Sequence, residues 1–132
     1  MLYERILICG SRDWSNIDII KCRLDKFDSN STVIHGDCRG ADKIAGGLAK
    51  SMGMKIEVYV ADWKIYGKSA GPRRNQKMLD DGKPTIVIAF HNDIDNSKGT
   101  ADMIARAKKL GIPTEILTED SMYSGNSSDE NC

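Results

Sequence analysis

TVIHGDCRGAD, at residues 32–42, passes from an apolar run directly into a polar loop that contains two glycines. The apolar part is continuous rather than alternating, which is typical of a strand buried on both faces of a parallel sheet. From Ala41 onward, apolar side chains recur at helical spacing as far as Met52. The stretch therefore predicts a strand, a polar loop and a helix in that order, which is the repeating unit of an α/β sheet.

The same alternation continues on both sides of this stretch. Apolar runs predict five strands, at Arg5–Cys9, Thr32–His35, Ile56–Val60, Thr85–Phe90 and Thr114–Leu117. A helix is predicted in each gap, with Ser15 capping the first, Pro72 in the first turn of the third and Thr100 capping the fourth. We expect the last three helices to end at Gly53, Gly82 and Gly111. Because such units join through right-handed crossovers, we expect an α/β, Rossmann-like three-layer sandwich, with a parallel sheet of about five strands flanked by helices.

The composition excludes several classes of partner. Lysine and arginine together number 19, as do aspartate and glutamate, so the formal net charge is zero. Proteins that bind duplex DNA usually carry a basic excess or stripe, and this chain shows neither, so no nucleic-acid partner is expected. No apolar run approaches the length of a membrane span, and residues 1–5 show no signal-peptide pattern. We therefore expect a cytoplasmic protein with no membrane partner.

The chain divides at one change of composition. From about residue 119 onward, serine, asparagine, aspartate, glutamate and glycine dominate. Segments this poor in apolar residues rarely form a core, so residues 119–132 are predicted to be a flexible acidic tail. Residues 1–118 have the length of one ordinary domain.

Unusual residues gather in the loops that follow the predicted strands, at 10–14, 35–42, 62–75 and 91–100, whereas the loops that precede strands are short. In a parallel sheet, the loops that follow strands all project from the carboxyl edge, where α/β folds bind ligands. Glycines there admit a close approach of backbone, helix N-termini favour anions, and arginine suits phosphate. Aromatic rings can cover a base or ribose, and carboxylates can accept hydrogen bonds from ribose hydroxyls. The predicted ligand-binding residues are Gly10, Ser11, Arg12, Trp14, His35, Gly36, Asp37, Arg39, Gly40, Asp42, Trp63, Tyr66, Lys68, Gly71, Pro72, Arg74, Asn75, Gly99 and Thr100.

Each of these residues also has a purely structural interpretation. Trp14 and Trp63 are equally suited to core packing, and His35 directly follows an apolar strand, where histidines are mostly structural. Asp42 has the position of a residue that complements a helix N-terminus. A zinc site on His35 and Cys38 lacks a second pair of ligands, so no metal and no cofactor are predicted. The convergence of four loops carries the prediction, and no single residue does.

The loop motifs resemble a known family. GSRxW at 10–14, HGxxRGAD at 35–42, WxxYGKxAGPxRN at 63–75, Phe90, and GT at 99–100 are similar to the YspA-like branch of the SLOG superfamily. The resemblance extends from Arg5 to Leu117. It implies a Rossmann-like fold, a nucleotide or nucleotide-derived ligand, and a homodimer or higher homo-oligomer. It also implies a bacterial setting, with small members of the superfamily in phages.

One branch of the superfamily, similar to the lonely-guy phosphoribohydrolases, cleaves the N-glycosidic bond of nucleoside monophosphates. Its signature PGGxGTxxE ends in a catalytic glutamate, and the matching position here is Met103, which is neither an acid nor a base. Asp102 is one residue away, about 100° around the helix. The resemblance therefore favours binding over cleavage, although another loop carboxylate, such as Asp37 or Asp62, can in principle replace the glutamate.

These observations lead to one functional hypothesis and two alternatives. The first is that the chain binds a small phosphorylated nucleotide of the ADP-ribose or NAD-derived type without cleaving it. A phage-type protein that sequesters such a signal and so opposes nucleotide-based immunity is its concrete form. The main alternative is a phosphoribohydrolase or related nucleotide N-glycosidase. A scaffold without a ligand is disfavoured, because it has no need for arginines and glycines gathered at one edge.

Overall fold

Five parallel strands form one sheet in the computed structural model, which describes residues 3–120. The strands are β1 (Arg5–Gly10), β2 (Thr32–His35), β3 (Lys55–Val58), β4 (Ile86–Phe90) and β5 (Thr114–Leu117). All five predicted strands are confirmed, with bounds that shift by at most two residues. The order β3-β2-β1-β4-β5 places β1 at the centre of the sheet.

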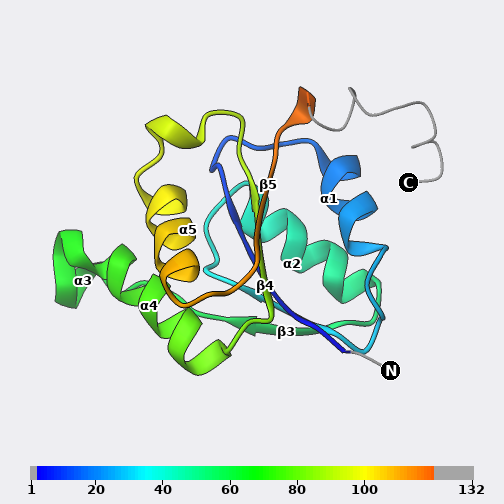
Figure 1. Cartoon of the computed structure of the whole chain (residues 1–132), viewed down its shortest axis with the longest axis horizontal. Helices are drawn as coiled ribbons and strands as arrows, with labels where there is room; N and C mark the ends of the chain where they lie inside the picture. Colours follow the sequence, from blue (N-terminus) through cyan, green and yellow to red (C-terminus); the bar gives the residue numbers. More distant parts are fainter. Residues whose placement is uncertain (1–2, 121–132) are drawn as a thin grey trace.

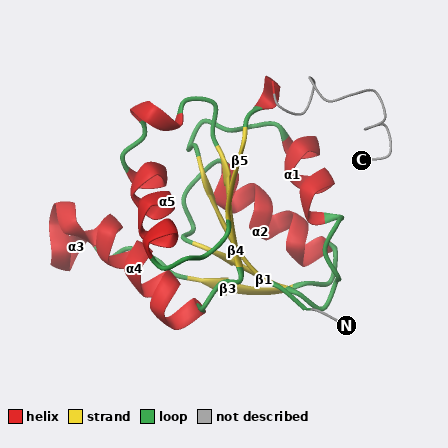
Figure 2. Ribbon diagram, in the orientation of Figure 1, coloured by secondary structure: helices red, strands yellow, loops and turns green. Residues whose placement is uncertain are grey.

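Helices cover both faces of the sheet (Figures 1 and 2). On one face lie α1 (Ile17–Leu24) and α2 (Ala41–Ser51), and on the other lie α4 (Ala70–Gly82) and α5 (Gly99–Lys109). The chain first winds from β1 outward to β3 and then returns to β4 on the far side of β1. Right-handed crossovers that run in opposite directions along a sheet place their helices on opposite faces. The predicted three-layer, Rossmann-like fold is therefore confirmed.

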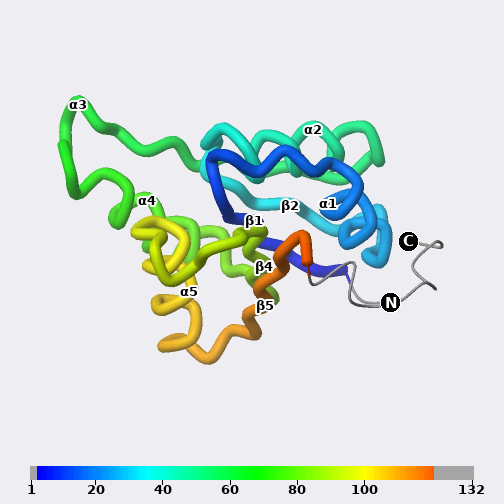
Figure 3. Tube along the Cα trace, turned by 90° about the horizontal axis from the view of Figure 1, so that it is seen from above, coloured from blue at the N-terminus to red at the C-terminus, as the bar shows by residue number. Residues whose placement is uncertain are grey.

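Three short helical turns complete the chain: α3 (Trp63–Tyr66), η1 (Gly67–Ser69) and η2 (Ile94–Asn96). The sequence predicts a loop at 62–75, so α3, η1 and the early start of α4 at Ala70 are corrections to it. Asp62 caps α3, because its side chain accepts a hydrogen bond from the Ile65 N–H at 3.1 Å. Figure 3 shows α3 at the end of a long excursion between β3 and α4, well away from the sheet.

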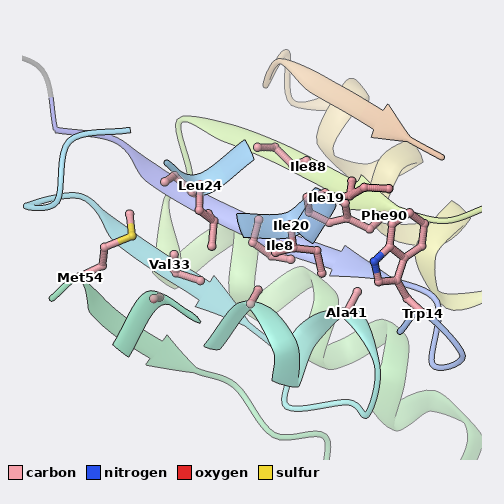
Figure 4. Close-up of a cluster of buried hydrophobic side chains, with 13 residues drawn as sticks. Ile8, Trp14, Ile19, Ile20, Leu24, Val33, Ala41, Met54, Ile88 and Phe90 are labelled. Carbon is pink, nitrogen blue, oxygen red and sulfur yellow. The ribbon is translucent and has the colours of Figure 1, made fainter. Parts of the chain in front are cut away.

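The core forms two clusters, one on each face, because successive side chains of a strand point to opposite sides. Along β1, Ile6 and Ile8 pack against α1 and α2, whereas Leu7 and Cys9 face α4 and α5. Burying each of these aliphatic side chains contributes about 1.5–3 kcal/mol. Figure 4 shows the first cluster, where the ring of Trp14 lies edge-on to Phe90 with a centroid distance of 5.7 Å.

The strand order reverses direction between β1 and β4, which pair from Ile6 and Ile86 up to Gly10 and Phe90. The Ser11 N–H continues this pairing by donating to the Phe90 carbonyl at 2.9 Å. Beyond this point the chain leaves β1 toward one face of the sheet and β4 toward the other. Such a switch point opens a crevice at the carboxyl edge, and α/β folds bind their ligands there.

Helix ends differ from the prediction at several residues. Asn16 rather than Ser15 caps α1, because its longer side chain accepts from the Ile19 N–H at 3.2 Å. Thr100 lies inside α5, and its own N–H donates to Ser97 Oγ at 3.0 Å. Gly82 is the last residue of α4, and Lys83 follows it in the left-handed conformation with a φ of 47°. Pro72 is the third residue of α4, within the predicted first turn.

Glu119, the first residue of the predicted tail, is tied to the loop after β4. Its N–H donates to Asn92 Oδ1 at 3.0 Å, and its carboxylate accepts from Asn92 Nδ2 at 2.9 Å. Residues 121–132, the rest of that tail, lie outside the described residues. Within residues 3–120, no helix is both long enough and apolar enough to span a membrane.

Candidate functional site

A cavity of about 690 Å³ opens at the carboxyl edge, next to the switch point between β1 and β4. This volume lies within the range of about 300–1,000 Å³ that is typical of small-molecule sites. Its walls come from the loop after β1, the loop after β2, α3 to α4, and the start of α5. Twelve of the predicted residues line it: Gly10, Ser11, Arg12, Asp42, Trp63, Lys68, Gly71, Pro72, Arg74, Asn75, Gly99 and Thr100.

A second, smaller cavity of about 290 Å³ adjoins the first, and Gly36, Asp37 and Arg39 line it. Four residues border both cavities: Arg12, Cys38, Trp63 and Arg74. Fifteen of the nineteen predicted residues thus border one or the other space, which adds Gly36, Asp37 and Arg39 to the twelve of the larger one.

The other four predicted residues have positions that do not border either cavity. Trp14 is buried in the core, and its indole N–H donates to the Asn16 carbonyl at 2.8 Å. His35 is buried, its Nδ1 accepts from the Asp37 N–H at 3.0 Å, and burial lowers its pKa. Tyr66 is exposed and carries the guanidinium of Arg73 over its ring at 4.5 Å. Gly40 packs beneath the loop after β1.

Two glycines hold the loop after β1 against its neighbours. A Cβ at Gly10 would lie 2.3 Å from the Phe90 carbonyl oxygen, and one at Gly40 would lie 2.3 Å from the Ser11 carbonyl oxygen. Gly40 also has a φ of 81°, which side chains rarely tolerate. The close packing lets the Ala41 N–H donate to the Ser11 carbonyl at 3.1 Å. The loop that carries Arg12 is therefore fixed at its base.

Arg74 is held between the two cavities by three contacts. Its Nη1 donates to the Gly36 carbonyl at 2.9 Å and lies 3.8 Å from the sulfur of Cys38. Its Nε donates to Asn75 Oδ1 at 3.0 Å. A guanidinium carries five N–H donors, and Nη2 forms no hydrogen bond within the described part of the chain. Arg74 thus presents a positioned cationic edge for an anion.

Asn75 connects Arg74 to α5. It is buried, and its Nδ2 donates to the Gly99 carbonyl at 3.2 Å and to Asp102 Oδ2 at 3.0 Å. The same Asp102 oxygen accepts from Arg106 Nε at 2.9 Å. Asp102 therefore lines the cavity with its carboxylate held in place, whereas the neighbouring Met103 is fully buried in the core.

The start of α5 opens onto the cavity. Ser97, Lys98, Gly99 and Thr100 all line it. The Thr100 and Asp102 N–H groups are bonded to Ser97 and Lys98, but those of Gly99 and Ala101 have no partner among residues 3–120. A Cβ at Gly99 would meet nothing within 4 Å. Free N–H groups at the positive end of a helix dipole favour an anion.

Asp42 closes the loop after β2 from below. Its carboxylate is buried and accepts from the Gly36 N–H at 2.9 Å and the Cys38 N–H at 3.4 Å. Burial raises the pKa of Asp42 to about 6, although these two N–H groups and Arg74 oppose the shift. Burial, together with the nearby Asp42 charge, also raises the pKa of the Cys9 thiol far above its usual range. Cys9 is therefore a neutral wall of the cavity.

Sequence reasoning missed several residues that line the larger cavity: Cys9, Asp13, Cys38, Met78, His91, Ser97, Lys98 and Asp102. Two of them could have been found from helical spacing, because residues four apart lie on the same face of a helix. Met78 stands four residues after Arg74, and Asp102 stands four residues after Lys98. His91, Ser97 and Lys98 belong to a loop that the sequence did single out. Within residues 3–120, no group of three or more His, Cys, Asp or Glu side chains is arranged to hold a metal ion.

The fold and the sequence both have known counterparts. Over 86% of its length the chain superposes on DNA processing protein A (DprA) from Streptococcus pneumoniae with a TM-score of 0.70 and 16% identity, and it spans 50% of that chain. It is 36% identical over 119 residues to Gene 61 protein of Mycobacterium phage D29, covering 83% of this chain and 93% of the relative. Residues 4–66 match the family model YAcAr. Because the family model matches the residues that carry the first two loop motifs, and the phage relative is 36% identical over most of both chains, the chain belongs to the YspA, cpYpsA-related SLOG family.

Proposed function

We propose that this protein binds a small phosphorylated nucleotide, of the ADP-ribose or NAD-derived type, in the 690 Å³ cavity and holds it without cleavage. The observation that carries the proposal is the convergence on one cavity of an open helix N-terminus, four cationic side chains and three carboxylates. The cations are Arg12, Lys68, Arg74 and Lys98, and the carboxylates are Asp13, Asp42 and Asp102. Family membership supports a nucleotide-related ligand.

The phosphate of the ligand is assigned to the start of α5. The unpartnered N–H groups of Gly99 and Ala101 supply two donors, and Lys98 adds a full positive charge beside them. Arg74 lies next to this position, because Asn75 bonds both its Nε and the Gly99 carbonyl. Charge-assisted hydrogen bonds of this kind are about twice as strong as neutral ones.

The nucleoside is assigned to the wall between α3 and α4. Trp63 is half exposed, and the edge of its six-membered ring lies 3.3 Å from the position of a Cβ at Gly71. The absence of a side chain at Gly71 lets the indole lie against α4 and offer a surface for a base or ribose. Asp102, held by Asn75 and Arg106, faces the same space and can accept from a hydroxyl or an amino group.

The face that α5 presents supports binding without cleavage. The residue that would carry the glutamate of the phosphoribohydrolase signature is Met103, and it is fully buried against the sheet. Asp102, which does face the cavity, is held in place because its Oδ2 accepts hydrogen bonds from both Asn75 and Arg106. Asp102 is therefore positioned to accept a hydrogen bond from a ligand, and it does not occupy the position of the signature glutamate.

One observation favours the alternative of a nucleotide N-glycosidase. Asp42 borders the cavity, and its pKa of about 6 lies where a general acid or base is effective near neutral pH. Its Oδ2 is nevertheless occupied by two backbone donors, the N–H groups of Gly36 and Cys38, so only Oδ1 is available to a ligand. This alternative therefore makes Asp42 its catalytic residue.

A sequestering role, in the cytoplasm of an infected bacterium, is the biological form of the proposal. A relative of similar length is encoded by a phage, and a protein that only withholds a signal needs a ligand cavity but no catalyst. Removing an NAD-derived messenger in this way would oppose anti-phage defence based on that messenger. Net neutrality supports a small ligand rather than nucleic acid.

The test is a thermal-shift panel of nucleotides and NAD-derived metabolites, including ADP-ribose and its cyclic forms, followed by mass spectrometry of the ligand after denaturation. A ligand that binds only the native state raises the melting temperature. We expect stabilisation by at least one diphosphate-containing nucleotide and its recovery intact. Turnover beyond one equivalent that is abolished by Asp42→Asn would establish the glycosidase instead, and a panel without any stabilising nucleotide would refute both.

A further inference from the structure

The two cavities share one wall, and two of its four residues are arginines. Arg12 and Arg74 border both the 690 Å³ and the 290 Å³ cavity, together with Cys38 and Trp63. We infer that the two cavities form one bipartite site, in which the smaller cavity is a subsite for a second sugar or similar polyol. The ligand class is then a nucleoside diphosphate whose terminal phosphate carries that second group. This inference rests on the proposed function.

The shared wall has the properties of a diphosphate position. Arg74 is fixed there by Gly36 and Asn75, with Nη2 unpartnered among the residues that the structure describes. The side chain of Arg12 is exposed and forms no hydrogen bond or ion pair within residues 3–120. Two arginines that line the same wall, one fixed and one exposed, suit the charge of a phosphate group.

The diphosphate position adjoins the phosphate position at α5. A single buried amide, that of Asn75, accepts from Arg74 Nε at 3.0 Å and donates to the Gly99 carbonyl at 3.2 Å. A chain of two phosphates can therefore run from the start of α5 to the arginine wall. The nucleoside end then occupies the larger cavity, and the group beyond the second phosphate enters the smaller one.

The smaller cavity has the chemistry of a sugar subsite. Asp37 and Arg39 supply polar groups, and Val60, Ala61 and Trp63 supply an apolar wall. Carboxylates accept from sugar hydroxyls, whereas apolar and aromatic surfaces pack against the C–H face of the ring. At about 290 Å³ the space is small for a separate ligand but adequate for one sugar ring of a larger molecule.

Asp37 is the group best placed to report on this subsite. It borders only the smaller cavity, and its φ of 61° is a left-handed conformation that asparagine also adopts readily. Its carboxylate pairs with Lys43 Nζ at 3.2 Å, and Lys43 borders neither cavity. Asp37→Asn therefore removes the charged acceptor without straining the backbone, and Lys43→Gln breaks the same ion pair without altering the cavity.

The experiment is isothermal titration calorimetry of the full chain with AMP, ADP and ADP-ribose. We expect the wild type to bind ADP-ribose at least tenfold more tightly than AMP. Asp37→Asn should lose about tenfold in ADP-ribose affinity, the loss expected for one hydrogen bond to a charged group, and none in AMP affinity. Lys43→Gln should leave both affinities unchanged.

Two results would overturn the bipartite site while leaving the proposed function intact. One is AMP and ADP-ribose binding with equal affinity to the wild type. The other is an Asp37→Asn variant, folded by circular dichroism, that binds ADP-ribose as the wild type does or that weakens AMP to the same degree. If no nucleotide binds the wild type at all, the proposed function itself fails, and the calorimetry separates the two cases.

Discussion

Nη1 of Arg74 donates to the carbonyl oxygen of Gly36 across 2.9 Å and lies only 2.5 Å from the position that a Cβ of residue 36 would occupy. The guanidinium therefore rests where any other residue would place a side chain. This contact joins the loop after β2 to α4 and sets the wall between the two cavities.

Gly36→Ala should displace Arg74 and weaken nucleotide binding by about tenfold, because a charge-assisted contact to phosphate is lost. Calorimetry with ADP-ribose measures the effect. Gly47→Ala is the matched control, since a Cβ there meets nothing within 4 Å in a helix and should leave affinity unchanged. Equal affinities for the two variants would show that Arg74 does not contact the ligand.

Lys98→Ala should lower nucleotide affinity several-fold, and the loss should shrink as salt is raised, because exposed charges are screened. The reason is the position of Lys98 at the open start of α5. Lys109→Ala, which removes the same charge from the other end of the helix, should have no effect. The measurement is the nucleotide affinity of both variants at low and at high salt. Equal losses of affinity for Lys98→Ala and Lys109→Ala would contradict a phosphate at the start of α5.

Asp42 should make the protein less stable as the pH rises from about 4 to about 6. Its folded pKa, about 6, lies above the ordinary value of 3.8, so in this range the native state holds a proton that the unfolded state releases. A shift of this size corresponds to about 3 kcal/mol. His35 has the opposite sign, because its pKa is lowered and stability is gained as the pH rises toward 6.5.

The free energy of unfolding, measured by denaturant titration between pH 4 and 8, checks this prediction. Asp42→Asn should remove the downward contribution and keep that of His35, so the variant should gain on the wild type as the pH rises. A difference between wild type and variant that stays constant over the whole range would mean that Asp42 is ionised throughout.

Self-association is predicted through the excursion between β3 and α4. Val60, Trp63, Ile65 and Tyr66 are exposed there, with Val60 and Ile65 about 70% accessible, and patches of this kind usually mark interaction sites. We expect a dimer by size-exclusion chromatography with light scattering, and a monomer for Ile65→Lys. Leu110→Lys, at an exposed apolar residue after α5, is the control and should remain dimeric. A monomeric wild type would exclude this surface as a dimer contact.

Met103→Glu should not create a glycosidase. The new carboxylate would lie in the core between α5 and the sheet, where an unpaired charge costs several kcal/mol. We expect a large fall in melting temperature and no release of base from a nucleoside monophosphate. Release of base by a folded Met103→Glu variant would show that residue 103 reaches the ligand.

The sequence predicts the layers of this fold better than its details. All five strands were found, with β2 and β5 at their observed bounds. The strands β1, β2 and β4 are largely buried and so are mostly apolar runs, whereas the edge strands β3 and β5 are partly exposed. The order of strands depends on which side of β1 each crossover returns, and nothing in the local sequence encodes that. The α3 and η1 turns were missed because residues 62–69 are almost all exposed and so carry no apolar stripe.

Most of the predicted site residues lie in the segments that follow strands or in the first two turns of the next helix, whereas the missed ones lie both in loops and within helices. Arg12 and Asp37 closely follow β1 and β2, and their place at the carboxyl edge depends only on the sheet being parallel. Met78 and Asp102 reach the cavity from inside α4 and α5, and their direction depends on the residue at which each helix begins. Trp14 has the composition of a stacking platform but lies in the core, because Phe90 offers it an apolar partner.

Asp102 and Met103 are adjacent in α5 but face different sides of the helix, and this bears on how a glutamate at residue 103 could reach the ligand. One residue faces the cavity and the next faces the sheet, so the two positions cannot exchange roles through a substitution at either of them. Turning the helix by about 100° is equivalent to adding or deleting one residue before it. In this chain, bringing residue 103 to the cavity would therefore require a change in the length of the loop at residues 91–98, and a substitution at residue 103 alone would not achieve it.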